Sequence, residues 1–167
     1  MRLLVTSDTH ADKPDDLPPS LVAAVEEADA VVHAGDFTSR SVLENFEDRA
    51  TLHAVHGNAD STEVCDALPR RTVFEADGVR VCVLHGHDAT DTAYEAAETG
   101  AHIVVRGHTH TPLYREYTVP VLNPGSPTRP RGSSSSYYAW LVCEEEQYSG
   151  RIVTLDGETL VEFGEEL

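Results

Sequence analysis

The chain has almost no lysine and a large excess of acidic residues. Of its 12 basic residues only Lys13 is a lysine, and 29 acidic residues bring the formal net charge to −17. Such a surface repels phosphate backbones, so we expect no binding to duplex nucleic acid. Few lysines and many carboxylates also suit a high-salt cytoplasm, where the Debye screening length is short and repulsion between like charges is weak. We hold this halophilic interpretation as a hypothesis beside that of an ordinary acidic protein.

Cysteines and long apolar runs are also scarce. Cys65, Cys82 and Cys143 lie far apart, form no CxxC pair and cannot all pair within one chain. We interpret them as buried, reduced thiols in a compartment where disulfides are rare. No apolar run approaches the roughly 20 residues that a membrane-spanning helix needs, and no secretory signal follows Met1. These absences predict a cytoplasmic protein without a membrane partner.

The length of 167 residues predicts a single domain over residues 1–167. The first half alternates short apolar runs with amphipathic stretches, which is typical of βαβ units around a mostly parallel sheet. Asp77-Gly78 then predicts a hairpin with antiparallel pairing. The expected strands are 3–7, 30–33, 51–56, 72–76, 79–84, 103–106, 113–117, 119–122, 137–142, 150–155 and 159–163, and the expected helices are 18–28, a second one capped by Ser39 or Ser41, and 91–99. We therefore expect an α/β fold, with a loop over 123–136.

Polar side chains follow five of these predicted strands directly. The five segments are Ser7-Asp8-Thr9-His10, Gly35-Asp36, Gly57-Asn58, His85-Gly86-His87 and Gly107-His108-Thr109-His110. Any one of them is explained equally well as turn chemistry, because Gly permits positive φ and Asp or Asn bonds to its own backbone. Turn chemistry does not readily explain all five. Since ligands of open α/β sheets gather outside the carboxyl ends of the strands, we expect the five segments to converge on one site.

The residue types in these segments indicate a metal site. Oxygen and imidazole donors without a thiolate favour a first-row ion, with Mn as our first choice and Ni, Fe or Zn as alternatives. The seven candidate ligands are Asp8, His10, Asp36, Asn58, His85, His108 and His110. Seven are too many for one ion but enough for two if one carboxylate bridges them, and paired ions are a known device for displacement at phosphorus. We expect Asp36 to be the bridge.

In the order Asp-x-His, Gly-Asp, Gly-Asn, His and Gly-His-x-His, these motifs resemble those of the calcineurin-like metallophosphoesterases. The resemblance covers residues 3–126 and includes Asn123-Pro124-Gly125-Ser126. The small size and Ser-Asp-Thr-His look like the compact phosphodiesterase branch, which also contains a scaffold subunit of the retromer coat. The resemblance implies a four-layer fold, a two-sheet β-sandwich flanked by helices. It further implies that a hydroxide bridging two metal ions attacks a small phosphodiester or nucleotide-like substrate.

The resemblance also implies how the ligands divide between the ions. One ion would be held by Asp8, His10 and His110 and the other by Asn58, His85 and His108, with Asp36 shared between them. The chain departs from larger members of the family at Ala59, where they carry a histidine that assists the leaving group.

Three further residues are candidates for the reaction. His87 lies two positions beyond His85 and, in extended chain, on the same side, so we consider it as the catalytic acid in place of Ala59. The alternatives are an outer role for His87 or a leaving group that needs no acid. Arg129 and Arg131 could clamp a substrate phosphate through paired donors, or belong to an ordinary surface loop.

The remaining histidines and two nearby acids have plainer interpretations. His33, His53 and His56 lie on expected strands, where we interpret most of them as structural. Asp12 and Asp60 follow the metal motifs and could orient a ligand histidine, or be solvated turn residues.

Three functions stay open at this point. The first is a phosphodiesterase, the second a phosphomonoesterase or nucleotidase, and the third a non-catalytic metal-binding scaffold. The sequence also leaves a homo-oligomer open.

Overall fold

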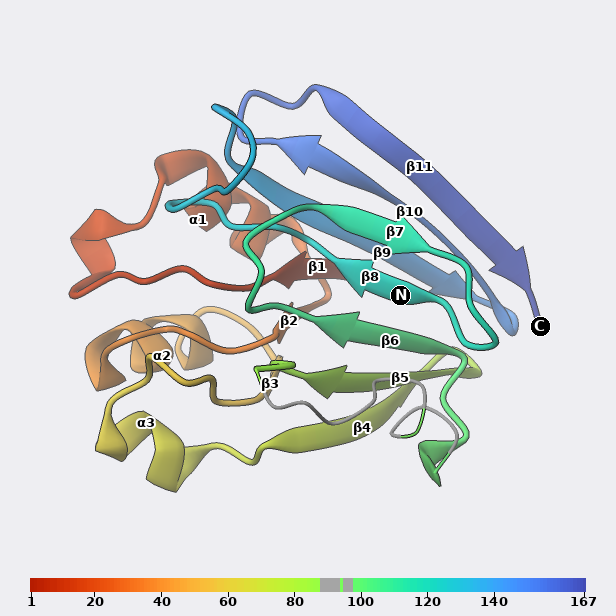
Figure 1. Cartoon of the computed structure of the whole chain (residues 1–167), viewed down its shortest axis with the longest axis horizontal. Helices are drawn as coiled ribbons and strands as arrows, with labels where there is room; N and C mark the ends of the chain where they lie inside the picture. Colours follow the sequence, from red (N-terminus) through yellow and green to blue (C-terminus); the bar gives the residue numbers. More distant parts are fainter. Residues whose placement is uncertain (88–93, 95–97) are drawn as a thin grey trace.

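Two β-sheets packed face to face form the centre of the computed structural model, which describes residues 1–87, 94 and 98–167 (Figure 1). The six-stranded sheet has the order β11-β10-β9-β1-β2-β3 and the five-stranded sheet the order β4-β5-β6-β8-β7. Three strands in each sheet run parallel: β1, β2 and β3 in the first, and β5, β6 and β8 in the second. The other strands pair antiparallel to their neighbours.

The first and last parts of the chain together form the six-stranded sheet, and the middle of the chain forms the five-stranded sheet. The six-stranded sheet is built from β1 (Arg2–Thr6), β2 (Ala30–His33), β3 (Leu52–Ala54), β9 (Tyr137–Glu144), β10 (Gln147–Thr154) and β11 (Thr159–Glu166). The five-stranded sheet is built from β4 (Arg71–Ala76), β5 (Val79–Leu84), β6 (Ile103–Arg106), β7 (Leu113–Arg115) and β8 (Val121–Asn123). Asp77 and Gly78, both with positive φ, form the tight turn between β4 and β5.

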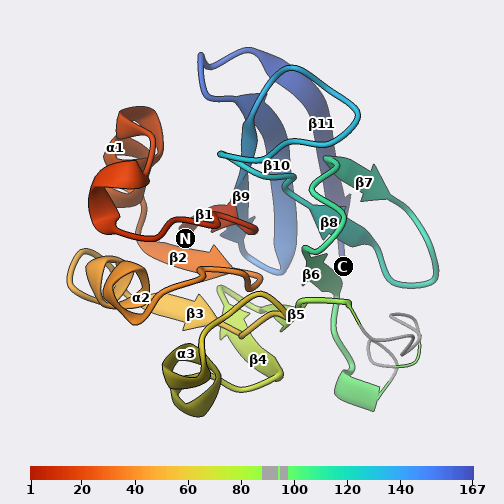
Figure 2. The same cartoon turned by 60° about the vertical axis from the view of Figure 1, so that its left-hand side comes forward.

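The helices lie together on one side of the molecule, where they cover the outer face of the six-stranded sheet (Figure 2). They are α1 (Pro19–Glu27) and α2 (Arg40–Glu47), preceded by a short 3-10 helix (Pro14–Asp16) and followed by α3 (Thr62–Ala67). Pro19 begins α1, where its missing N–H costs nothing. Ser39 caps α2, because its side chain accepts a hydrogen bond from Val42 N–H at 3.4 Å.

Alternation along the strands divides the core into layers. In β1, Leu3 and Val5 belong to the cluster between the two sheets, and Leu4 belongs to the cluster beneath the helices. Because both faces of this parallel region are covered, its strands are apolar almost throughout. The outer face of the five-stranded sheet carries a smaller cluster that includes Cys82 and Val104.

The structure confirms the α/β sandwich flanked by helices, and each expected strand is present. The strands 30–33, 79–84 and 103–106 have the expected bounds, and the ends of the others are shifted by one to a few residues. The third strand is shorter than expected, covering only Leu52–Ala54. Sequence analysis missed α3, since six residues with Val64 as the one buried side chain give no helical period. The expected helix 91–99, which would supply the fourth layer, falls mostly outside the described residues.

Two expectations from composition can be compared with the fold. Within the described part of the chain, no helix has both the length and the apolar character required to cross a membrane. All three cysteines are free: Cys82 and Cys143 are buried as expected, whereas Cys65 is only half-buried.

Candidate metal centre

The parallel strands of both sheets end at one edge of the sandwich, and the candidate ligands follow them directly. In Figure 1 the arrows of β5, β6 and β8 point in the same direction, towards this edge. The segments after β1, β2, β3, β5 and β6 carry, in this order, Asp8 and His10, Asp36, Asn58, His85, and His108 and His110. The expected convergence of five segments is therefore what the fold produces.

Backbone strain is concentrated in these segments. Nine non-glycine residues in the described chain have positive φ, and five of them are candidate ligands. They are Asp8 (φ 55), His10 (39), Asp36 (62), His108 (69) and His110 (60). Asp and His tolerate this conformation better than most residues, but it still costs free energy and typically marks functional sites. The fold thus holds these side chains in positions that local preference alone would not choose.

Four of the candidate ligands form a compact first group, Asp8, His10, Asp36 and His110. Their ligand atoms all lie within 4.8 Å of one another. His10 Nε2 lies 3.2 Å from His110 Nε2 and 3.4 Å from Asp36 Oδ2, and His110 Nε2 lies 3.3 Å from Asp8 Oδ1. Nitrogen and carboxylate lone pairs at such distances repel one another unless a proton or a cation lies between them.

Asp8 shows that a cation fits this group. Its Oδ2 accepts hydrogen bonds from the Ser7 hydroxyl at 2.7 Å and from His108 N–H at 3.0 Å. Its Oδ1 is buried and has no hydrogen-bond partner in the described structure. Burial raises the pKa of Asp8, although the bond from Ser7 opposes the change. A buried carboxylate oxygen without a partner is costly, and a divalent ion bound by this group would satisfy it.

Two histidines are oriented by backbone carbonyls behind them. His110 Nδ1 lies 2.6 Å from Arg129 O, and His85 Nδ1 lies 2.7 Å from Ala34 O. Because a carbonyl can only accept, each Nδ1 carries the proton and donates it. When the ring is neutral, its Nε2 then presents a lone pair towards the carboxylates, which is the arrangement typical of metal-binding histidines.

The second group consists of Asn58, His85 and His108 and is more open. His85 Nε2 lies 3.2 Å from Asn58 Oδ1, and the rings of His85 and His108 are 5.3 Å apart between centroids. His85 is buried, His108 half-buried and Asn58 exposed. Burial and the positive charge of His85 lower the pKa of His108, as do more distant arginines. The second group therefore faces solvent on one side.

Asp36, a member of the first group, also reaches the second group. Its Oδ2 is 3.4 Å from His10 Nε2 and 3.3 Å from His85 Nε2, while its Oδ1 accepts a hydrogen bond from Ala59 N–H at 2.8 Å. Burial opposes ionisation of Asp36, but the hydrogen bond and charge of His85, the N–H of Ala59 and the charge of His10 together outweigh it and hold its pKa at about 2. Conversely, burial lowers the pKa of His85, but Asp36, the carbonyl of Ala34 and the charge of Asp8 together raise it by more, so that the net shift is upward. One carboxylate is thus within reach of both groups.

Glycines allow the loops around Asp36 to approach this closely. A Cβ at Gly57 would collide with the Asp36 carboxylate, and one at Gly35, where φ is +93, would lie 2.8 Å from Gly57 N and from His85 Nδ1. No other residue fits at these two positions without displacing a candidate ligand.

Asp60 anchors these loops through their backbone. Its carboxylate accepts N–H bonds from Asp36 at 3.0 Å, from Thr38 at 2.7 Å and from Gly57 at 2.7 Å. Burial raises the pKa of Asp60, although these bonds counteract the shift. Asp60 therefore orients the backbone on both sides of the site rather than a ligand histidine. Asp12, in contrast, is exposed.

The loop after β8 clamps the first group from the other side. The Ser126 hydroxyl donates to Asp8 O at 2.7 Å and accepts from Arg129 N–H at 2.8 Å. The Thr128 hydroxyl donates to Thr9 O at 2.7 Å. Sequence analysis missed this clamp, for which the only signal was the Asn-Pro-Gly-Ser segment of the resemblance.

The three further candidates lie around the rim. The ring of His87 is 5.4 Å from that of His85 and 6.3 Å from that of His108, between centroids. Burial and the charges of His85, Arg70 and His108 lower the pKa of His87. Arg129 and Arg131 are exposed, and their backbone atoms bond to His110 through Arg129 O and Arg131 N–H.

The charges of these two arginines reach the site. Burial lowers the pKa of His10 to about 4, partly offset by Asp36 and reinforced by His110 and Arg129. Arg131 contributes in the same sense at His108. The rim is therefore more positive than the rest of this acidic chain.

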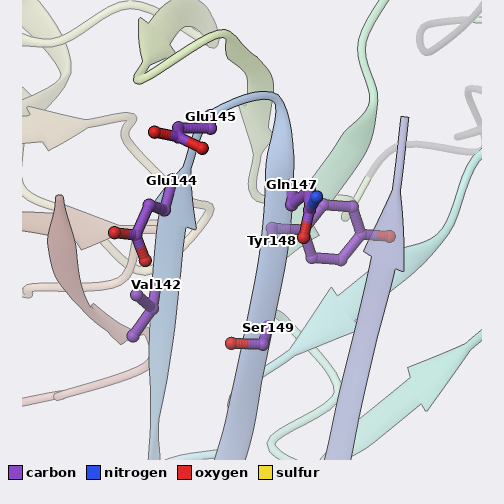
Figure 3. A pocket seen from close by; sticks show the side chains of 6 residues that line it. All are labelled: Val142, Glu144, Glu145, Gln147, Tyr148 and Ser149. Atoms are coloured by element: carbon purple, nitrogen blue, oxygen red, sulfur yellow. The ribbon is translucent and has the colours of Figure 1, made fainter.

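A pocket elsewhere does not have this chemistry. It lies on the β9–β10 hairpin and is lined by Val142, Glu144, Glu145, Gln147, Tyr148 and Ser149 (Figure 3). Val142 pairs with Arg2 at the start of β1, so this pocket is at the opposite end of the sheet from Asp8. With two glutamates and no imidazole or basic side chain in its lining, it does not suit a phosphate.

Comparisons with known proteins show the family of the chain. Residues 1–146 match the family model of the calcineurin-like phosphoesterase superfamily domain. A probable metallophosphoesterase from Methanothermobacter thermautotrophicus is 37% identical over 138 residues, which are 78% of this chain and 80% of the relative. A phosphodiesterase from Methanocaldococcus jannaschii is 29% identical over 140 residues, covering 75% of this chain and 83% of its own length.

Solved structures have the same fold. A predicted phosphoesterase from Streptococcus pneumoniae superposes with a TM-score of 0.75 at 28% identity, covering 98% of this chain and 97% of that one. Vacuolar Protein Sorting 29 from Cryptosporidium parvum superposes with a TM-score of 0.83, covering 99% and 98%, but at 18% identity this likeness concerns the fold alone.

Proposed function

Because the chain belongs to the calcineurin-like phosphoesterase superfamily, we propose that it is a phosphodiesterase that uses two divalent metal ions. The observation that carries the proposal is the place of Asp36, whose Oδ2 lies 3.4 Å from a histidine of one group and 3.3 Å from a histidine of the other. The likeness to a phosphodiesterase from Methanocaldococcus jannaschii favours diesters over monoesters.

The seven expected ligands divide between two ions in this proposal. Asp8, His10 and His110 would hold the first ion and Asn58, His85 and His108 the second, and Asp36 would serve both. When bound, the ions would supply Lewis acidity that makes water nucleophilic at neutral pH and offsets charge at phosphorus. The donor set, with no thiolate, keeps Mn as the first choice and Ni, Fe and Zn as alternatives.

The chain's own residues supply orientation and charge. The carbonyls of Arg129 and Ala34 fix the rings of His110 and His85, so that little reorganisation is needed when an ion binds. The exposed guanidinium groups of Arg129 and Arg131 attract the phosphate and can pair with its oxygens. A small substrate suits this rim, because the negative surface beyond it repels long polyanions.

His87 is our candidate for the proton donor to the leaving group. It is half-buried, and its ring lies 5.4 Å from that of His85 and 6.3 Å from that of His108, between centroids. Replacing it should matter most where the leaving group is a poor one. We expect His87→Asn to slow hydrolysis of an alkyl phosphodiester by about 100-fold and that of a p-nitrophenyl diester much less. Equal losses for both esters would remove His87 from this role.

Hydrolysis of model diesters tests the whole proposal. The purified protein would be assayed with bis-p-nitrophenyl phosphate and with p-nitrophenyl phosphate, with Mn, Ni or Zn and after chelation, in dilute buffer and in molar salt. We expect metal-dependent hydrolysis, faster for the diester. Faster hydrolysis of the monoester would make the chain a phosphomonoesterase or nucleotidase. Metal binding without hydrolysis in any salt would favour a scaffold instead, and activity only in molar salt would support the halophilic hypothesis.

A further inference from the structure

His33 was interpreted from sequence as a structural histidine, but its contacts lead into the candidate site. It is the last residue of β2, is fully buried, and lies three residues before Asp36. Its ring stacks on that of Phe37 at 3.5 Å and meets that of Phe46 edge-on at 5.3 Å. Packing therefore fixes the plane of the ring, and the question is what its two nitrogens do.

Each ring nitrogen of His33 has a polar partner. Nδ1 accepts the backbone N–H of Gly35 at 3.2 Å, so the ring proton must be on Nε2. Nε2 lies 3.1 Å from the Thr9 hydroxyl, to which it can only donate. The Thr9 hydroxyl in turn donates to Asp36 O at 3.5 Å. Burial lowers the pKa of His33 far enough to keep the ring neutral, as this tautomer requires.

These bonds connect the two loops that carry the first group. Beyond β1 and β2 the loops continue side by side, with Asp8 N–H bonded to Gly35 O at 2.9 Å and His10 N–H to Asp36 O at 3.0 Å. Thr9 lies between Asp8 and His10 and is fully buried. His33 holds Thr9 on one side and Gly35 on the other, so it contacts both loops at the point where they diverge from regular pairing.

We propose that His33 is a positioning residue that keeps the Asp8–His10 loop and the Gly35–Asp36 loop in register through Thr9 and Gly35. Few side chains could replace it. Asn could accept from Gly35 but is too short to reach Thr9, and Phe could keep the stacking but makes neither bond. The consequence for metal binding rests on the proposed function, whereas the consequence for the loops does not.

Amide hydrogen exchange in the metal-free protein tests the loop part directly. In His33→Phe the amides of Asp8 and His10 should lose protection at least tenfold more than that of Val104, which bonds to Pro120 O in the other sheet. His33→Asn and Thr9→Val should produce the same local loss, and combining Thr9→Val with His33→Phe should add little. A loss of equal size at all three amides would mean that His33 only packs the core and would overturn the proposal.

His53→Phe is the matched control. His53 is also a strand histidine stacked on a phenylalanine, Phe74, at 3.7 Å, but no hydrogen bond links it to either loop in the described structure. It should leave the protection of Asp8 and His10 unchanged relative to Val104. If His53→Phe exposed these two amides as strongly as His33→Phe does, the effect would not be specific to His33 and the proposal would fail.

Mn affinity, measured by competition with a chelator, provides the functional readout. His33→Phe should weaken the tighter ion by about 10- to 100-fold, the range typical of residues that orient metal ligands, with no such change in His53→Phe. Unchanged affinity in His33→Phe would overturn the positioning role. If the parent protein bound no Mn at all, the proposed function would fail, while the exchange experiment would still decide whether His33 holds the loops.

Discussion

The two groups of candidate ligands differ in how deeply their side chains are buried and how firmly the surrounding chain holds them. In the first group the side chains of Asp8, His10 and His110 are 0%, 9% and 6% exposed, and backbone contacts surround them. In the second group His85 is buried as deeply, but His108 is half-buried and Asn58 exposed. The buried group is suited to hold an ion permanently, whereas an ion in the open group would be accessible to substrate. We therefore expect the first ion to bind more tightly.

The largest effect is expected where the two groups meet. Asp36→Asn removes the one carboxylate within reach of both, so it should weaken both ions by more than the roughly 10- to 100-fold that outer changes cost. Diester hydrolysis should fall at least as far. Metal content per chain and turnover, measured on one preparation, check this expectation.

Asp12→Asn is the control for Asp36→Asn. Asp12 is an exposed carboxylate close to His10 in sequence, and its loss changes the net charge equally. It should leave metal content and turnover unchanged. If Asp36→Asn retained two tightly bound ions, the bridging role would be wrong.

Changes confined to one group should separate the two ions. Asn58→Ala should lower the metal content from two ions per chain to one, because the first group is complete without it. His10→Ala should weaken the tighter ion instead, by about tenfold or more. Titration with Mn followed by chelator competition would show which class of site is lost. Loss of both ions in Asn58→Ala would mean that the groups do not bind independently.

Much of this arrangement could be predicted from sequence, because it depends on local signals. Apolar runs predicted the strands, and Asp77-Gly78 predicted the hairpin. The rule that ligands gather beyond the carboxyl ends of strands predicted that the five motifs lie at one site. The signal for the site was strong because each motif comes within a few residues of the end of a strand.

The rest depends on contacts between distant residues, for which the sequence has no local signal. Ser126 bonds to Asp8 O, 118 residues away in the chain, and Asp60 bonds to backbone amides rather than side chains. His33 lies in a run of buried residues where it cannot be distinguished from a packing residue. Positive φ at the candidate ligands is also imposed by tertiary structure. In a sequence only glycine indicates positive φ, and the ligands are aspartates and histidines.

A smaller effect concerns how the stability of the protein depends on pH. This dependence should differ between the metal-free protein and the protein with metal bound to the second group. The pKa of His85 is raised in the fold, so its pairing with Asp36 stabilises the protein fully below about pH 6.5 and is lost as the pH rises through the folded pKa. The pKa of Asp36 is lowered to about 2, so its contribution is present above about pH 4 and is lost as the pH falls towards that value. The metal-free protein should therefore gain most from this pair between about pH 4 and 6.5.

Urea unfolding at pH 5.5 and pH 8 measures this dependence. In the presence of chelator the parent should be stabilised relative to His85→Asn more strongly at pH 5.5 than at pH 8, because the raised pKa of His85 adds stability only while its ring is protonated. With saturating Mn the sign should reverse, because metal binding displaces the proton from His85 and grows stronger as pH rises. A chelated parent whose stability relative to His85→Asn was the same at both pH values would contradict the pairing.

The smallest effect concerns Thr38, whose φ of 86 is unusual for a β-branched residue. Its N–H donates to Asp60 Oδ1 at 2.7 Å, its carbonyl accepts from Ser61 N–H at 3.0 Å, and its buried hydroxyl has no partner in the described structure. Thr38→Gly removes about 1–2 kcal/mol of strain and adds up to about 1 kcal/mol of backbone entropy cost. We expect a net gain of about 0 to 2 kcal/mol in unfolding free energy.

The gain in stability should be accompanied by weaker metal binding, because the first group is then less rigidly preorganised. Freed of its strained neighbour, Asp36 should be held less firmly, so Mn affinity should fall by a few-fold while urea unfolding shows a more stable protein. Thr38→Ala is the matched variant, because it removes the hydroxyl and the branch but keeps the penalty of positive φ. If the glycine variant were less stable than the alanine variant, positive φ at Thr38 would not be a source of strain. Backbone strain near Asp36 would then not explain the preorganisation of the first group for metal binding.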